Sequence, residues 1–111
     1  MLNTYTEKFV VVNGVRVHYQ EWGESSSPDV LLVHGWSTSA PIWHEIACEL
    51  SSDYHVIVPD NRGNGESQVQ EHGYRLSDYA TDLAKLILEI QLDRPALVGS
   101  SWGGNIGTYM A

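Results

Sequence analysis

The chain has 111 residues and a formal net charge of −8 at pH 7, with 42% hydrophobic and 18% charged residues. A chain of this length forms at most one domain, and its composition is that of a globular protein rather than a disordered segment. Its six basic residues are scattered, whereas a nucleic-acid-binding face needs clustered lysine and arginine. We therefore expect a globular protein that does not bind nucleic acid.

Cysteine content and hydropathy exclude further classes. Cys48 is the only cysteine, which leaves no disulfide framework and no cysteine-rich metal site. No apolar run reaches the length of a membrane span, and no basic-then-apolar leader follows the first methionine. The histidines have no partners at metal-ligand spacing. We expect a cytoplasmic protein with no metal, no cofactor and no membrane association, whose partner is a small-molecule substrate; its oligomeric state stays open.

Two β-like runs open the chain, at 5–12 and 15–21. Asn13-Gly14 lies between them and is a strong hairpin signal, because both residues accept positive φ. Apolar and polar residues alternate along the second run, which predicts one buried side and one solvent-facing side. The solvent-facing side would carry Arg16, His18 and Gln20.

Strand-like and helical patterns then alternate to the end of the chain. The predicted strands are 30–33, 55–58 and 96–99. Apolar residues at helical spacing predict helices over 41–50 and 76–92, with Ser77 as the N-cap of the second. A polar, glycine-containing loop is expected over 61–74.

This alternation predicts an α/β fold with a mostly parallel sheet, an N-terminal β-hairpin and helices on both faces. We expect the three later strands to lie in one sheet and the two helices to cover opposite faces. The last strand, 96–99, is expected to leave an open edge. We also expect apolar side chains such as Val33 and Val58 to be exposed.

The most specific motif lies at 99–103, where Gly99-Ser100-Ser101-Trp102-Gly103 places a serine in a Gly-x-Ser-x-Gly turn. The turn follows a strand-like run and precedes a helix-compatible segment. Such a turn strains the backbone of its central serine, and its glycines let strand and helix pack closely. The pattern predicts an exposed Ser101 hydroxyl at the end of the sheet.

Two further turns follow predicted parallel strands, at 34–36 and 60–67. Ligands of open parallel sheets bind at the carboxyl ends of the strands, so these turns and the Ser101 turn are expected to share one rim. In order and spacing, the three turns resemble the N-terminal part of the α/β-hydrolase fold family, in its serine-nucleophile branch. The resemblance covers essentially the whole chain. It implies that residues 1–111 are the N-terminal portion of a single α/β-hydrolase domain, a truncated fold ending just after the nucleophile elbow.

The resemblance also implies roles for individual residues. Ser101 would be the nucleophile, and the backbone N–H groups of Trp36 and Trp102 would form the oxyanion hole. The side chains of these tryptophans either line the acyl pocket or only pack against neighbours. Supporting residues would be His34, whose ring holds the oxyanion loop, and Arg62, paired with a carboxylate. The other supporting residues would be Gly35, Asp60, Gly99 and Gly103.

In this family the triad acid and histidine follow the serine in the chain, whereas all five histidines here precede Ser101. The resemblance therefore implies a serine hydrolase of small acyl compounds, with carboxylic esters as the expected substrates, that lacks its acid and histidine in this stretch and is inactive alone. The alternatives are a non-catalytic remnant or ligand-binding module of this fold, or a lactonase, carbon–carbon bond hydrolase or perhydrolase. Members acting on haloalkanes and epoxides usually carry aspartate at this position, so Ser101 argues against both.

Overall fold

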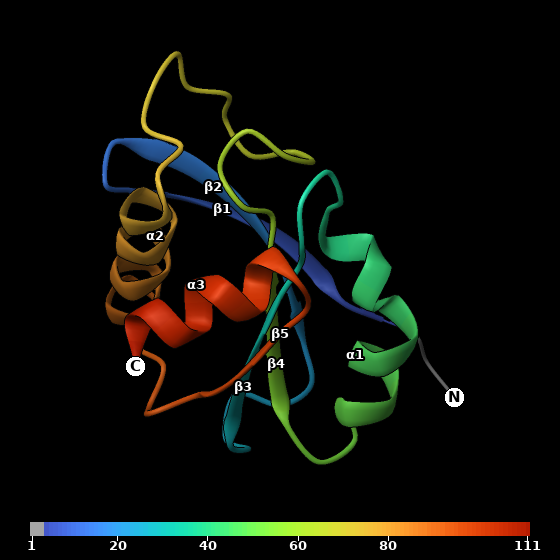
Figure 1. The fold of residues 1–111 in the computed structure, drawn as a ribbon. Helices are drawn as coiled ribbons and strands as arrows, with labels where there is room; N and C mark the ends of the chain where they lie inside the picture. The colour runs from blue at the N-terminus through green and yellow to red at the C-terminus, as the bar shows by residue number, and fades with distance from the viewer. Residues whose placement is uncertain (1–3) are drawn as a thin grey trace.

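Strands and helices alternate along the chain as its sequence predicts (Figure 1). The structure is a computed structural model, and it describes residues 4–111. The elements, in chain order, are β1 (Thr6–Val12), β2 (Val15–Trp22), β3 (Asp29–Val33), the 3₁₀ turn η1 (Ala40–Trp43), α1 (His44–Leu50), β4 (His55–Pro59), α2 (Leu76–Glu89), β5 (Ala96–Gly99) and α3 (Trp102–Met110).

All five strands form one sheet in the order β1-β2-β4-β3-β5. β3 pairs in parallel with β4 and β5, whereas β2 pairs antiparallel with β1 and β4. The predicted hairpin is confirmed, since Asn13 and Gly14 have φ angles of 52° and 72°. The three later strands therefore share a sheet as expected, and their carboxyl ends meet at one rim.

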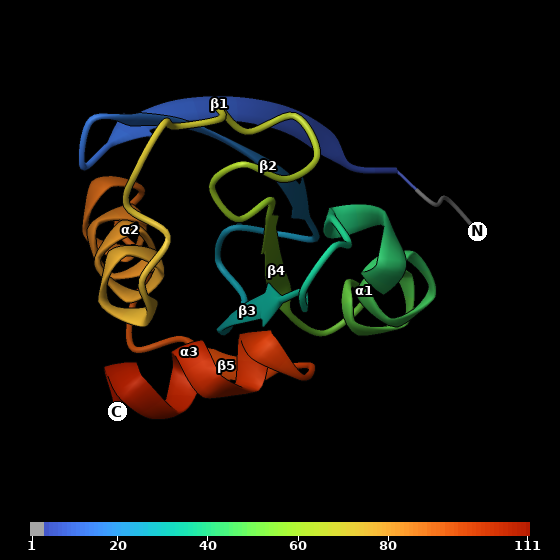
Figure 2. The same ribbon diagram turned by 45° about the horizontal axis from the view of Figure 1, so that its top comes forward.

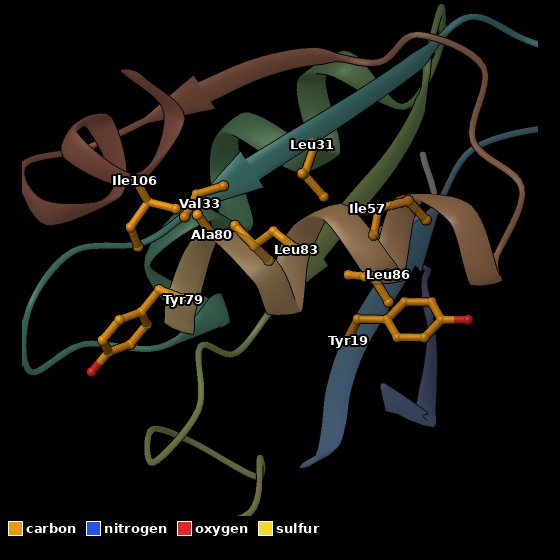
Figure 3. Packing of buried hydrophobic residues seen from close by; sticks show 9 residues of the cluster. All are labelled: Tyr19, Leu31, Val33, Ile57, Tyr79, Ala80, Leu83, Leu86 and Ile106. Carbon is orange, nitrogen blue, oxygen red and sulfur yellow. The ribbon is translucent and has the colours of Figure 1, made fainter. Parts of the chain in front are cut away.

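The two faces of the sheet are covered by different helices, which confirms the predicted layering (Figure 2). On one face, α2 and α3 pack against Leu31, Val33 and Ile57 of the parallel strands (Figure 3). On the other face, η1 and α1 pack against Val56 and Val58. Because neighbouring residues of a strand point to opposite faces, the continuous apolar runs of β3 and β4 supply both layers.

Val33 and Val58 are both fully buried, so the prediction that they are exposed is wrong. Val33 packs beneath α2 and α3, and Val58 packs beneath α1. Among the three parallel strands, the exposed apolar side chains lie on β5 instead. Val98 is 43% exposed, and β5 is the last strand of the sheet.

The prediction that Arg16, His18 and Gln20 on β2 face solvent is also wrong for two of these three residues. Arg16 is exposed, but His18 and Gln20 are each only 3% exposed. Polar partners satisfy both side chains: Gln20 accepts a hydrogen bond from the Trp22 indole, and His18 lies between two carboxylates. Alternation predicts which residues share a face, but it does not say whether another segment covers that face.

The helix bounds differ from the predicted ones for local reasons. Residues 41–50 form a 3₁₀ turn followed by an α-helix rather than one continuous helix. Ser77 lies inside α2; the N-cap is Arg75, whose backbone N–H donates to the Asp78 carboxylate. The last α2 turn closes through a hydrogen bond from Leu92 N–H to the Ile87 carbonyl, with Gln91 at a φ of 59°.

At the opposite end of the sheet from the rim, His55 joins three strands. Its Nδ1 lies 2.6 Å from an Asp29 carboxylate oxygen on β3, and its Nε2 lies 2.6 Å from a Glu21 carboxylate oxygen on β2. Burial lowers the pKa of His55, but its hydrogen bonds to Asp29 and Glu21 and their charges outweigh burial, so the pKa is raised overall. The folded protein therefore holds this proton more tightly than the unfolded chain.

We expect His55→Gln to destabilise the protein most at acidic pH. A raised folded pKa adds stability that is fully present below the ordinary value of 6.5 and is lost as pH rises through the folded pKa. Urea unfolding of both proteins from about pH 5 to 9 measures the difference in unfolding free energy at each pH. A difference that grows with pH contradicts this assignment.

Candidate active site

Ser101 lies in the turn between β5 and α3. Its φ of 55° and ψ of −114° are strained for a residue with a Cβ, and the residue is exposed, as the motif predicts. Gly99 and Gly103 bracket the turn. A Cβ on Gly99 would overlap the backbone of Gly103, so strand and helix approach each other too closely for any side chain at this position.

The 34–36 turn lies directly against the Ser101 turn. A Cβ on Gly35 would lie 2.9 Å from the Ser100 carbonyl oxygen, 3.3 Å from the Ser101 Cβ and 3.7 Å from the Trp102 nitrogen. Among residues 4–111, neither the Trp36 N–H nor the Trp102 N–H donates to a backbone acceptor in these turns. The 34–36 turn therefore lies against the turn that holds Ser101.

His34 holds the shape of the first turn. It is fully buried, and its Nε2 accepts a hydrogen bond of 2.9 Å from the Asn61 N–H. Its Nδ1 therefore carries the proton and donates it to the Gly35 carbonyl at 2.7 Å. Burial lowers the pKa of His34 more than the Gly35 hydrogen bond and the nearby Asp60 charge raise it, which suits this neutral tautomer. His34 is thus engaged through both nitrogens.

Asp60 connects the second turn to the first. The residue is 1% exposed, and one carboxylate oxygen accepts a 2.6 Å hydrogen bond from the Ala40 N–H. The other oxygen accepts a 2.9 Å hydrogen bond from the Glu66 N–H, within its own loop. Asp60 therefore fixes the loop that follows β4 and the segment that follows the 34–36 turn.

Arg62 has a carboxylate partner, as the sequence predicts, and the partner is Asp82 on α2. The guanidinium Nε and Nη2 donate to the two Asp82 oxygens at 2.6 Å each, while Nη1 donates to the Gly73 carbonyl at 2.7 Å. The Asn13 amide also donates to Asp82, at 2.9 Å. This buried group joins the hairpin, the 61–74 loop and α2. Asp82 was missed because nothing in its helical pattern marks it.

Two tryptophan side chains line the same depression as Ser101. Trp36 is 61% exposed, and its ring meets the Trp102 ring edge-on at 5.1 Å between centroids. A shallow depression of about 310 Å³ is lined by Trp36, Ser101, Trp102 and Asn105. The structure therefore places both tryptophan side chains in the wall of a depression that contains the serine. Asn105, one helical turn after Ser101, is the lining residue that sequence reasoning missed.

No histidine of residues 4–111 lines this depression. His18, His34 and His55 each have both ring nitrogens engaged elsewhere. Within the same described residues, no group of three or more histidine, cysteine, aspartate or glutamate side chains could hold a metal ion. Nor does any helix there have the length and apolar character needed to cross a membrane.

Comparison with known proteins places the chain in a family. A profile described as "alpha/beta hydrolase fold" matches residues 28–111, and the chain belongs to this family. The soluble epoxide hydrolase of a Corynebacterium species is 32% identical over 111 residues, covering all of this chain and 38% of that protein. The non-heme chloroperoxidase of Streptomyces lividans is 34% identical over 101 residues, covering 89% of this chain and 37% of that protein.

A solved structure gives the same result. The crystal structure of epoxide hydrolase VrEH1 from Vigna radiata superposes with a TM-score of 0.91 at 31% identity, covering 96% of this chain and 35% of that one. The fold is thus that of the α/β hydrolases. The chain spans little more than a third of the length of these relatives.

Proposed function

We propose that this chain carries the nucleophile and oxyanion-binding part of a serine hydrolase that acts on small acyl compounds, with carboxylic esters as substrates. The observation that carries the proposal is the Ser101 turn itself. Ser101 is exposed in a strained turn at the rim where parallel strands end, and the 34–36 turn packs against it.

In the proposed reaction the Ser101 hydroxyl oxygen attacks the carbonyl carbon, and a general base takes the hydroxyl proton. The carbonyl oxygen becomes an oxyanion that accepts hydrogen bonds from the Trp36 and Trp102 N–H groups. Preorganised donors of this kind stabilise the transition state by roughly 3–4 kcal/mol each. The leaving alcohol takes up the proton, and water then hydrolyses the acyl-serine ester.

A serine at this position favours acyl substrates over epoxides and haloalkanes on chemical grounds. Attack of a serine oxygen on an epoxide or halogenated carbon would form an ether, which has no carbonyl for water to attack. Attack on an acyl carbon forms an ester, which water can hydrolyse. The epoxide hydrolase names of several relatives therefore do not carry over to this chain.

The reaction needs a histidine as general base and a carboxylate that orients it. No histidine, aspartate or glutamate of residues 4–111 lines the depression. We propose that both come from residues outside this stretch, following the serine in the family's order. The indole rings of Trp36 and Trp102 would then contact the acyl group. The proposed reaction uses only a serine, a general base and backbone donors, and we propose that it takes place in the cytoplasm without a cofactor.

The test is labelling with a fluorophosphonate and hydrolysis of a p-nitrophenyl ester by the protein in its full translated length. Ser101→Ala should abolish labelling and lower kcat by about 10⁴-fold or more. Ser100→Ala is the matched control, because this neighbouring serine is also exposed but lies outside the centre of the motif. Residues 1–111 alone should react near background, because the serine lacks a base.

Two outcomes count against the proposal. Unchanged ester hydrolysis by Ser101→Ala would place the reaction at another group. Absence of labelling and of ester hydrolysis in the full-length parent would favour the alternative, a non-catalytic binding module of the same fold.

A further inference from the structure

His18 is a buried histidine on β2 that the proposed reaction does not use. The residue is 3% exposed, and both ring nitrogens face carboxylates. Nδ1 lies 2.8 Å from an Asp60 oxygen, and Nε2 lies 2.9 Å from a Glu7 oxygen on β1. A carboxylate oxygen accepts hydrogen bonds, so the Nδ1 that faces Asp60 is the donor of that contact.

The Asp60 carboxylate joins His18 to the rim. The oxygen that faces His18 also accepts from the Glu66 N–H, while the other oxygen accepts from Ala40 N–H at 2.6 Å. Ala40 begins η1, which follows the turn that holds Trp36. The Asp60 side chain therefore links β2 to the segment that follows the 34–36 turn.

A second contact supports the same path. The His18 backbone N–H donates to the Ser67 hydroxyl at 2.9 Å, and that hydroxyl donates to the Asp60 carbonyl at 2.7 Å. Both the main chain and the side chain of His18 thus fix the start of the 60–67 loop. Phe9 on β1 covers the ring at 5.0 Å between centroids.

We propose that His18 is a positioning residue for the oxyanion-binding turn: its Nδ1–H fixes the Asp60 carboxylate in the rotamer that accepts the Ala40 N–H. This inference rests on the proposed function for its effect on catalysis. A carboxylate that is 1% exposed needs all of its donors. Without the His18 donor it turns toward other partners, and the segment from Trp36 to Ala40 loses one of its anchors, the contact from Asn64 to the Thr38 carbonyl remaining.

Two substitutions separate positioning from simple packing. The amide nitrogen of asparagine reaches the place of the histidine Nδ1, whereas that of glutamine reaches the place of Nε2. His18→Asn therefore keeps a donor toward Asp60, and His18→Gln keeps a donor only toward Glu7. Both variants lose the aromatic ring, so a role limited to packing predicts equal effects.

In the protein in its full translated length, we expect His18→Gln to lower kcat for the ester by roughly tenfold or more with KM nearly unchanged. A misplacement of about 1 Å can cost about 10²-fold. His18→Asn should restore most of the activity. Equal kcat values for the two variants would overturn the proposal.

Hydrogen exchange gives a readout that does not depend on activity. We expect the Ala40 and Glu66 amide protons to exchange at least tenfold faster in His18→Gln than in His18→Asn. If Ser101→Ala leaves hydrolysis unchanged, the proposed function fails while this comparison still stands. Equal exchange in the two variants would show that His18 only packs.

Asp60→Asn serves as the second variant if His18→Gln does not fold, because it removes the shared charge and keeps the side-chain shape. The same fall in kcat and the same faster Ala40 exchange are expected. Parent-like values for both would overturn the proposal.

Discussion

Replacing Asp82 by alanine is expected to lower the free energy of unfolding by about 3–5 kcal/mol, because it leaves a buried guanidinium without its carboxylate. The Arg62 and Asp82 side chains are only 6% and 5% exposed, and two hydrogen bonds of 2.6 Å join them. Asn13 would lose its acceptor as well. The expected loss is a large part of the stability of a typical small domain.

Asp93→Ala is the matched control for this prediction. Asp93 and Arg94 also form an ion pair, but their side chains are 82% and 92% exposed, and solvent screens such pairs. Urea unfolding of the three proteins should therefore separate the variants clearly, with Asp93→Ala close to the parent. A similar small change in both variants would mean that the Arg62–Asp82 pair contributes little beyond its packing.

The sequence predicted those parts of the fold that depend on near neighbours. Asn13-Gly14 marks the hairpin because its two residues accept positive φ, and 99–103 marks the tight turn because its glycines remove side chains at a close approach. The shared rim followed from strand geometry, since the carboxyl ends of parallel strands lie side by side.

Distant partners account for what the sequence did not predict. His18 was expected to face solvent, but Asp60, 42 positions later in the chain, covers it. Asp82 binds Arg62 from 20 positions away on α2. The alternating pattern of a strand does not indicate whether a distant residue will form a hydrogen bond with one of its polar side chains. Both missed residues belong to hydrogen-bonded groups that join elements, which no local pattern encodes.

The Arg62–Asp82 and His18–Asp60 groups join the loop after β4 to different elements. The Arg62–Asp82 group fixes the 61–74 loop to α2 and the hairpin. The His18–Asp60 group fixes the start of the same loop to β2 and η1. The loop after β4 is therefore held at both ends by buried charges, which lets it support the rim without regular secondary structure.

Gly103→Ala is expected to destabilise the protein and, by misplacing the catalytic groups, to slow the reaction of Ser101 by about 100-fold or more in the full-length chain. A Cβ at this position would overlap the Val33 carbonyl oxygen and lie 2.8 Å from the His34 carbonyl oxygen. These are backbone atoms of β3 and of the turn after it, which cannot rotate away. The start of α3 must therefore move away from the sheet, carrying the Trp102 N–H with it, and overpacking of this kind costs typically 1–3 kcal/mol.

Gly104→Ala isolates the steric effect, because both glycines lie in α3 and both substitutions gain helix propensity. The closest atom to a Cβ on Gly104 is the Gly99 carbonyl oxygen at 3.6 Å, an ordinary van der Waals distance. With glycine about 1 kcal/mol less favourable than alanine in a helix interior, Gly104→Ala should leave stability unchanged or raise it. Urea unfolding and the rate of fluorophosphonate labelling measure the two effects. Labelling of Gly103→Ala at the rate of Gly104→Ala would show that α3 can shift without displacing Ser101 from its partners.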